Sequence, residues 1–190
     1  MERLKKEFGL EIRWVGFPLH PDVPFGGMTL DELFQGSNYD ISGVQARLVK
    51  IAKEEGLPFL DNHKMTYNSR SAQELAKWAE GLGKGEAFHD AAFRAVFAHD
   101  RNIGKDDVLF ELAGSIGLDK EEADKVLKDE SFSEAVDRDW EYCRKLGVTA
   151  VPTFIYGGRA IVGAQPYEAL KKLVEEPGKG PSPFNMLRSG

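Results

Sequence analysis

Residues 147–158 read Gly-Val-Thr-Ala-Val-Pro-Thr-Phe-Ile-Tyr-Gly-Gly, and the chain continues through Arg159 to Gly163-Ala164-Gln165-Pro166. Gly147 is typical of the residue that ends a helix. The apolar residues on either side of Gly157-Gly158 predict a β-hairpin, because two glycines suit a two-residue turn between antiparallel strands. This stretch therefore predicts a helix end, a tight Val-Pro-Thr turn and a short hairpin that closes on Gly163.

The composition excludes several classes of protein. The 190 residues carry a formal net charge of −6 and dispersed basic residues, so we expect no nucleic-acid partner. No apolar run reaches transmembrane length, so we expect no membrane partner. Residues 1–8 do not have the pattern of a signal peptide. The one cysteine, Cys143, excludes an intramolecular disulfide and predicts a reducing, cytoplasmic location.

Apolar spacing predicts an α/β layout in which one long helical stretch separates two smaller β-containing parts. Leu4 and Phe8 mark an amphipathic helix that Gly9 stops, and residues 10–17 alternate like a strand. Helical spacing then dominates until Gly147. The predicted divisions are an N-terminal part at 1–27, a helical insertion at 28–147, a C-terminal part with hairpin and helix at 148–176, and a flexible tail at 177–190.

Four motifs in this order resemble the DsbA family of thioredoxin-like proteins, in particular its cytoplasmic FrnE-like branch of dithiol–disulfide oxidoreductases and isomerases. The resemblance covers about residues 1–175 and implies a thioredoxin-like fold with a large all-helical insertion. Gln73 departs from it, since relatives often carry His there. The motifs are Trp14-x-x-Phe17-x-Leu19-x-Pro21, Asn68 followed by Ala72 and Leu75, Gly147-Val148-x-x-Val151-Pro152-Thr153-Phe154, and Gly163-Ala164-Gln165-Pro166.

The front of the chain departs from the family pattern. Family members begin with a central β-strand, a C-P-W-C-like motif and a helix, whereas Met1–Gly9 resembles only the second half of that helix. We therefore expect the central strand to be missing, with unpaired backbone on either side of its place. The start site can lie at an internal Met, the chain can be a fragment, or the protein can fill the place with its own tail or a partner's strand.

The resemblance implies that the Val151–Pro152 bond is cis and that Val151 offers its backbone to an extended substrate. It implies these substrate-binding residues: Val151, Pro152, Thr153, Phe17, Gly163 and Gln165. It implies no catalytic residue within the chain, because the cysteine pair is absent.

The remaining candidate residues favour structural roles. Cys143 falls on the apolar face of a helix near its C-terminus, where the helix dipole disfavours a thiolate, so we expect a buried structural cysteine. His20, His63, His89 and His99 lack metal-ligand spacing, and Asp61-Asn62-His63 is typical of a polar surface loop. We expect no metal and no cofactor.

Three functions stay open. The first is a thiol–disulfide oxidoreductase or isomerase that is inactive as this chain stands. The second is a redox-inactive module that binds a peptide or a partner. The third is a relative of glutathione-dependent isomerases or kappa-class glutathione transferases. The expected partners are a thiol or disulfide peptide, glutathione, or a second copy of the chain in a strand-exchanged homodimer.

Overall fold

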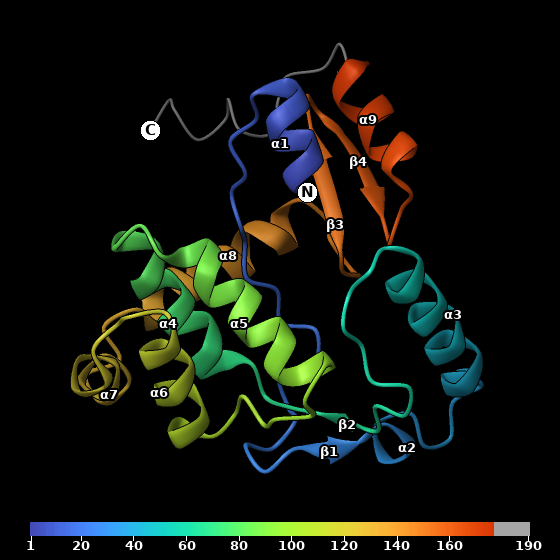
Figure 1. Cartoon of the computed structure of the whole chain (residues 1–190). Helices are drawn as coiled ribbons and strands as arrows, with labels where there is room; N and C mark the ends of the chain where they lie inside the picture. Colours follow the sequence, from blue (N-terminus) through green and yellow to red (C-terminus); the bar gives the residue numbers. More distant parts are fainter. Residues whose placement is uncertain (177–190) are drawn as a thin grey trace. The chain divides into compact units, whose positions relative to one another are not determined.

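The computed structural model describes residues 1–176, which divide into two compact units (Figure 1). The helical unit is His20–Asp137, and the hairpin unit joins Met1–Leu19 to the residues from Arg138 onward. These borders, at 19/20 and 137/138, fall eight and ten residues before the predicted divisions at 27/28 and 147/148. The predicted tail at 177–190 lies outside the described residues.

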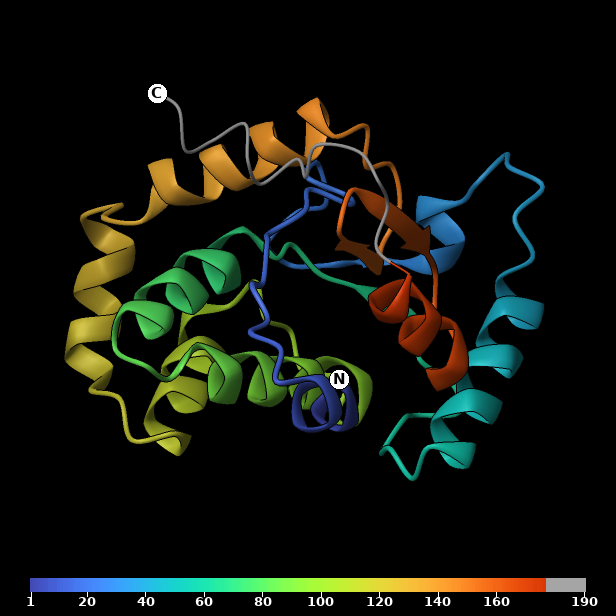
Figure 2. The same cartoon turned by 90° about the horizontal axis from the view of Figure 1, so that it is seen from above.

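The helical unit is built from amphipathic helices, as the apolar spacing predicts. Figure 2 shows the four helices from α4 to α7 gathered together. A two-residue antiparallel ladder between β1 and β2 was not predicted from the sequence, and it is too short to leave a period-2 pattern. The elements are β1 (Met28–Thr29), α2 (Leu30–Leu33), α3 (Ile41–Glu54), β2 (Met65–Thr66), α4 (Arg70–Gly81), α5 (Gly85–Phe97), α6 (Asp106–Ser115) and α7 (Lys120–Lys128).

The core of the helical unit lies among the helices α4, α5, α6 and α7. Leu75 of α4, Phe88 of α5 and Leu109 of α6 are fully buried there. Arg70, at the start of α4, donates to Glu74 Oε1 at 2.9 Å and to Asp137 Oδ1 at 2.6 Å. This ion-pair network ties α4 to the beginning of α8 (Ser133–Lys145), the helix along which the chain passes from one unit to the other.

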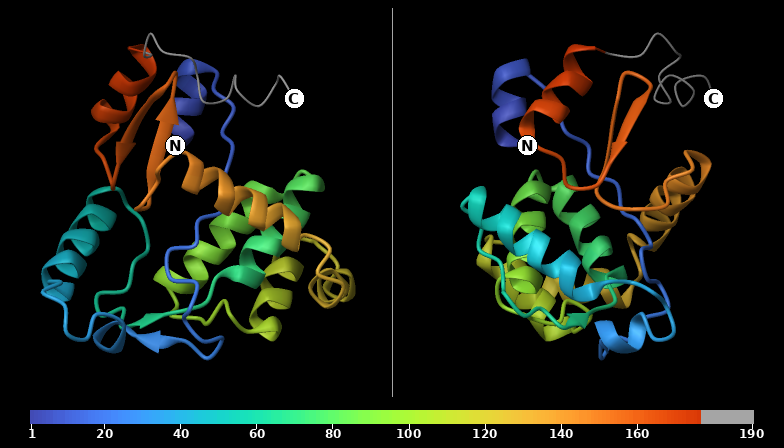
Figure 3. Two further views of the ribbon diagram at one scale, coloured as in Figure 1. Left: turned by 180° about the vertical axis from the view of Figure 1, so that it is seen from behind. Right: turned by 90° about the vertical axis from the view of Figure 1, so that its right-hand side faces the viewer.

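The hairpin unit contains α1 (Glu2–Phe8), β3 (Thr153–Tyr156), β4 (Arg159–Val162) and α9 (Tyr167–Glu175). Gly157 and Gly158 both have positive φ, 55° and 79°, which gives the predicted two-residue turn. The helices α1 and α9 lie side by side (Figure 3), joined by an ion pair of 2.7 Å between Lys171 Nζ and Glu7 Oε1. The predicted helix at residues 1–8, the hairpin and the last helix are therefore present.

The predicted strand at residues 10–17 is not formed. In the described part of the chain, β3 pairs only with β4, and residues 10–17 are extended outside any sheet. A strand exists only where a neighbour accepts its ladder hydrogen bonds, and this segment is held by a helix instead. Gly16 N donates to Asp139 Oδ2 of α8 at 2.8 Å, and the Cys143 thiol lies 3.5 Å from Gly16 O.

None of the described helices is both long enough and apolar enough to cross a bilayer.

Candidate functional site

The candidate site is the turn that leads from α8 into β3. The helix gives way to this turn at Gly147, whose φ of 69° lets Val148 N donate back to Cys143 O at 3.0 Å. The Val151–Pro152 peptide bond that follows is cis. Thr153 Oγ1 donates to Ala150 O at 2.6 Å and so closes the turn on itself.

The end of β4 forms the second side of the site. Gly163 N donates to Pro152 O at 2.8 Å, and Gln165 Nε2 donates to Val162 O at 2.7 Å. The hairpin thus brings together five of the six predicted site residues, from Val151 to Gln165. The sixth, Phe17, lies at the end of the extended segment that α8 holds through Gly16, and its role stays a prediction.

The outer edge of β3 carries backbone N–H and C=O groups that form no hydrogen bond to any other described strand. The hydrogen bond from Gly163 to Pro152 continues the β3–β4 ladder, so Phe154 and Tyr156 bond toward β4. Because the direction alternates along an antiparallel strand, Thr153 and Ile155 aim their N–H and C=O groups at the opposite edge. Within the described residues, β3 has a neighbouring strand on one side only.

Val151 extends this edge into the turn. Val151 is 44% exposed, and neither its amide nor its carbonyl has a hydrogen-bond partner among the described residues. Val162, at the end of β4, is 53% exposed. Unpaired backbone beside exposed apolar side chains is what an extended peptide needs in order to add to a sheet edge.

Cys143 is the one thiol of the chain, and its surroundings disfavour the thiolate. The residue is 6% exposed, at the last turn of α8, as predicted. Burial raises the pKa of its thiol, the charge of Asp139 raises it further, and Arg13 opposes them. Since the thiolate is the nucleophile in disulfide exchange, burial and a raised pKa both disfavour attack by this thiol.

Asp139 is a buried carboxylate that sequence reasoning missed. The residue is 4% exposed, accepts the hydrogen bond from Gly16 N and lies 3.6 Å from Arg13 Nη2. The only sequence signal was its place one turn before Cys143, on the same helix face. Asp139 fixes the segment that ends at Phe17.

Asp61 and Asn62 are exposed in a loop as predicted, but His63 beside them does not face solvent. Its ring is buried, with its centroid 5.5 Å from that of Phe97 and its Nδ1 atom 3.3 Å from Asp100 Oδ1. Burial lowers the pKa of His63, and the nearby Asp100 carboxylate opposes this in part. No group of three or more His, Cys, Asp or Glu side chains comes together as a metal site would require in residues 1–176.

Comparisons with known proteins bear on the family and the fold of the chain. Residues 1–175 match the model of the DSBA-like thioredoxin domain. The chain is 27% identical over 173 residues to the uncharacterised protein YwbO of Bacillus subtilis, covering 88% of this chain and 82% of YwbO.

Two solved structures are similar. One is a Streptomyces coelicolor protein described as a probable DsbA oxidoreductase, with a TM-score of 0.79, 28% identity and coverage of 87% of this chain and 74% of that one. The other is a 2-hydroxychromene-2-carboxylate isomerase, with a TM-score of 0.61, 18% identity and coverage of 85% and 78%, which is a likeness of fold alone.

Proposed function

The chain belongs to the family of DSBA-like thioredoxin domains, and from this premise we propose that it binds an extended thiol or disulfide peptide in thiol–disulfide oxidoreductase or isomerase chemistry. The observation that carries the proposal is the open edge of β3, which begins at the exposed backbone of Val151. The Streptomyces structure, described as an oxidoreductase, supports the same chemistry.

The substrate adds to the hairpin as a further strand. Val151, Thr153 and Ile155 offer alternate backbone groups along one line, so a peptide in extended form pairs with them residue by residue. Backbone pairing supplies affinity without demanding a particular side chain. A site of this kind accepts many sequences, which suits an enzyme that acts on cysteines in different proteins.

The exchange of disulfides requires thiols other than Cys143. One thiolate attacks the disulfide, forms a mixed disulfide and releases the other sulfur of the substrate as a thiolate. A second thiolate then attacks the mixed disulfide and releases the peptide sulfur. Residues 1–190 contain only Cys143, which is buried. On this proposal the chain binds and orients the peptide, and the two exchanging sulfurs are carried by other residues or molecules.

The binding step is tested by titrating the protein with a fluorescently labelled, alkylated insulin B chain. Val151→Pro removes the backbone donor, whereas Val151→Ala retains the donor and shortens the side chain. One hydrogen bond contributes about 0.5–1.5 kcal/mol, so we expect affinity to fall roughly threefold to tenfold in the proline variant only. Equal affinity of the two variants would remove Val151 from the binding edge.

The redox step is tested separately by insulin reduction with dithiothreitol. We expect no turnover from the 190-residue chain, because it lacks a second thiol. Turnover that survives Cys143→Ser would contradict the expectation that the chain cannot reduce insulin without further thiols.

Peptide binding without turnover is expected on this proposal and equally on the second candidate, a redox-inactive binding module, for which the single buried cysteine is the specific observation. Displacement of the peptide by glutathione would favour the third candidate, a glutathione-dependent enzyme. Absence of peptide binding would overturn the proposal.

A further inference from the structure

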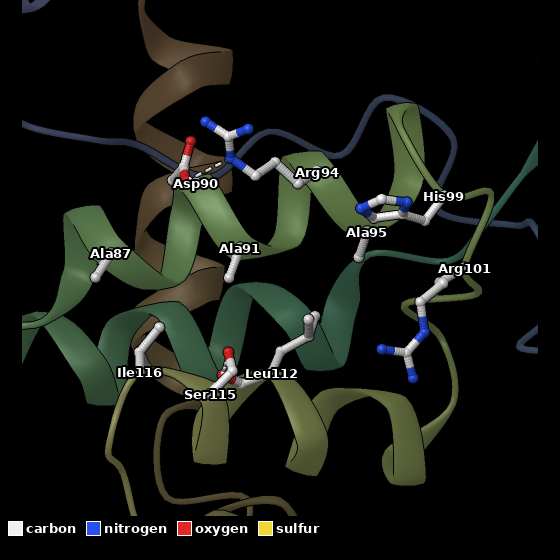
Figure 4. Close-up of a pocket in the computed structure, with 10 residues that line it drawn as sticks. All are labelled: Ala87, Asp90, Ala91, Arg94, Ala95, His99, Arg101, Leu112, Ser115 and Ile116. Carbon is white, nitrogen blue, oxygen red and sulfur yellow. Dashed lines mark hydrogen bonds and ion pairs between the residues drawn. The ribbon is translucent and has the colours of Figure 1, made fainter. Parts of the chain in front are cut away.

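A pocket of about 410 Å³ opens in the helical unit between α5 and α6, and the proposed function does not use it (Figure 4). Its size falls in the range of small-molecule sites, roughly 300–1,000 Å³. All of its lining residues come from residues 87–116, so the pocket belongs to one unit.

The floor of the pocket is apolar. Ala91 and Ala95 of α5 face Leu112 of α6 and Ile116 just beyond it, and Figure 4 shows the two alanine side chains pointing toward this side. Alanine is too short to fill the space between the helices, although Ala95 and Leu112 themselves belong to the buried core. The floor is therefore formed by core residues that no other side chain covers.

One end of the pocket is basic. His99 and Arg101 lie together there, beyond the end of α5 (Figure 4). Arg101 Nη2 donates to Glu111 Oε2 at 2.5 Å, while its Nε and Nη1 atoms have no partner among the described residues. A guanidinium has five N–H donors and can bind a second carboxylate beside the first.

The other arginine of the rim is engaged differently. Arg94 Nε donates to Asp90 Oδ2 at 2.7 Å, and in Figure 4 this pair lies on the side of α5 away from Leu112 and Ile116. Arg94 therefore contributes less to the charge that a ligand on the floor would meet. The basic end rests chiefly on Arg101.

We propose that this pocket binds a small amphipathic carboxylate, with its apolar body on the floor and its carboxylate on Arg101 and His99. A neutral apolar molecule would leave the donors of Arg101 unused, and a cation would be repelled by them. A dianion would be opposed by Glu111, which already occupies one side of the guanidinium. A single carboxylate on an apolar body satisfies both ends of the pocket.

The test titrates the full chain with decanoate, a straight-chain acid, and with phenylbutanoate, an aromatic one, and follows binding by calorimetry and by amide NMR shifts. Decyltrimethylammonium is the matched cation. We expect saturable one-to-one binding of at least one acid, weaker at high salt, with shifts in α5 and α6. The stronger acid identifies the apolar body that the floor accepts.

The variants separate charge from shape. Hydrogen bonds to charged groups are strong, so Arg101→Gln is expected to weaken binding about tenfold or more. Glu111→Gln is expected to strengthen it, since a competing carboxylate disappears. Ala91→Phe fills the floor and is expected to abolish it. Lys50→Gln, which removes a charge paired with Glu54 on α3, is the control and leaves binding unchanged.

Equal binding of the cation, or equal affinity after Arg101→Gln and Glu111→Gln, would overturn the proposal in favour of simple apolar adsorption. Shifts confined to α3 would also overturn it. Because the glutamine variants alter only surface charges, they keep the test valid even if Ala91→Phe does not fold. None of these outcomes depends on peptide binding at Val151, so the two proposals fail independently.

Discussion

Asp139 performs two functions from one buried position on α8. Its carboxylate holds the extended segment through Gly16 N, and its charge adds to burial in raising the pKa of the Cys143 thiol. Arg13 Nη2, at 3.6 Å, partly balances the charge from the exposed side. The residue that shapes the Phe17 segment is therefore also one that raises the pKa of the only thiol.

We expect Asp139→Ala to lower the free energy of unfolding by about 1–3 kcal/mol, because it leaves the partly buried amide of Gly16 without its acceptor. Asp139→Asn keeps an acceptor oxygen and is expected to cost less. Urea unfolding followed by tryptophan fluorescence measures both changes. The exposed acid Glu141, which pairs with Lys145 on the same helix, gives the control variant Glu141→Ala.

An equal loss in Asp139→Ala and Glu141→Ala would show that the hydrogen bond to Gly16 does not stabilise the protein. Alkylation of Cys143 by iodoacetamide offers a second measurement. Asp139→Asn removes a charge that raises the thiol pKa, so the reaction at neutral pH is expected to be faster than in the unchanged protein.

The local structure and burial of a residue were predictable from the sequence where they depend on neighbours in the chain. The turn at Val151-Pro152-Thr153 and the buried place of Cys143 follow from local spacing. Asp139 and His63 were missed because their partners, Gly16 and Asp100, lie far away in the sequence. The sequence of one chain carries no signal for contacts between residues that lie so far apart along it.

The same reasoning holds for whole elements. The helix α1, the β3–β4 hairpin and α9 carry their own stop and turn signals, so the sequence predicted them. Residues 10–17 carry a strand pattern but form no strand, since pairing depends on a neighbour that the described residues do not supply. Local propensity predicts extended backbone there and cannot predict its pairing.

His63 links two segments of the helical unit, because it lies in the loop before β2 and its ring contacts the carboxylate of Asp100, which follows α5. Burial lowers its pKa below the ordinary value of 6.5, so the unfolded chain takes up a proton before the folded one does. The stability that neutral His63 contributes is therefore full above about pH 6.5 and is lost as the pH falls below it.

We expect His63→Gln to reduce this acid dependence of the unfolding free energy between pH 7 and pH 5, measured by urea titration at several pH values. Burial also lowers the pKa of His20, which adds a dependence of the same sign and remains in the variant. The exposed His99 supplies the control variant His99→Gln. An unchanged slope in His63→Gln would contradict the prediction.

At the scale of the whole molecule, the hairpin unit is the part whose sheet is left open. Its two strands form a complete ladder with one another, yet the outer edge of β3 has no neighbour in residues 1–176. Open edges with exposed apolar side chains are where sheets gain strands from other chains. A second copy of the chain is one source of such a strand, alongside a peptide substrate.

We predict that the protein associates with itself through this edge when no peptide is present, and that sedimentation velocity at increasing concentration detects it. Ile155→Pro removes the outward N–H and leaves the β4 ladder intact, since proline is tolerated on an edge strand. We expect it to weaken association roughly tenfold. Ile155→Ala loses side-chain packing but keeps the N–H, so it separates the two contributions. A monomer at all concentrations, or equal association of the two variants, would show that the β3 edge does not join two copies.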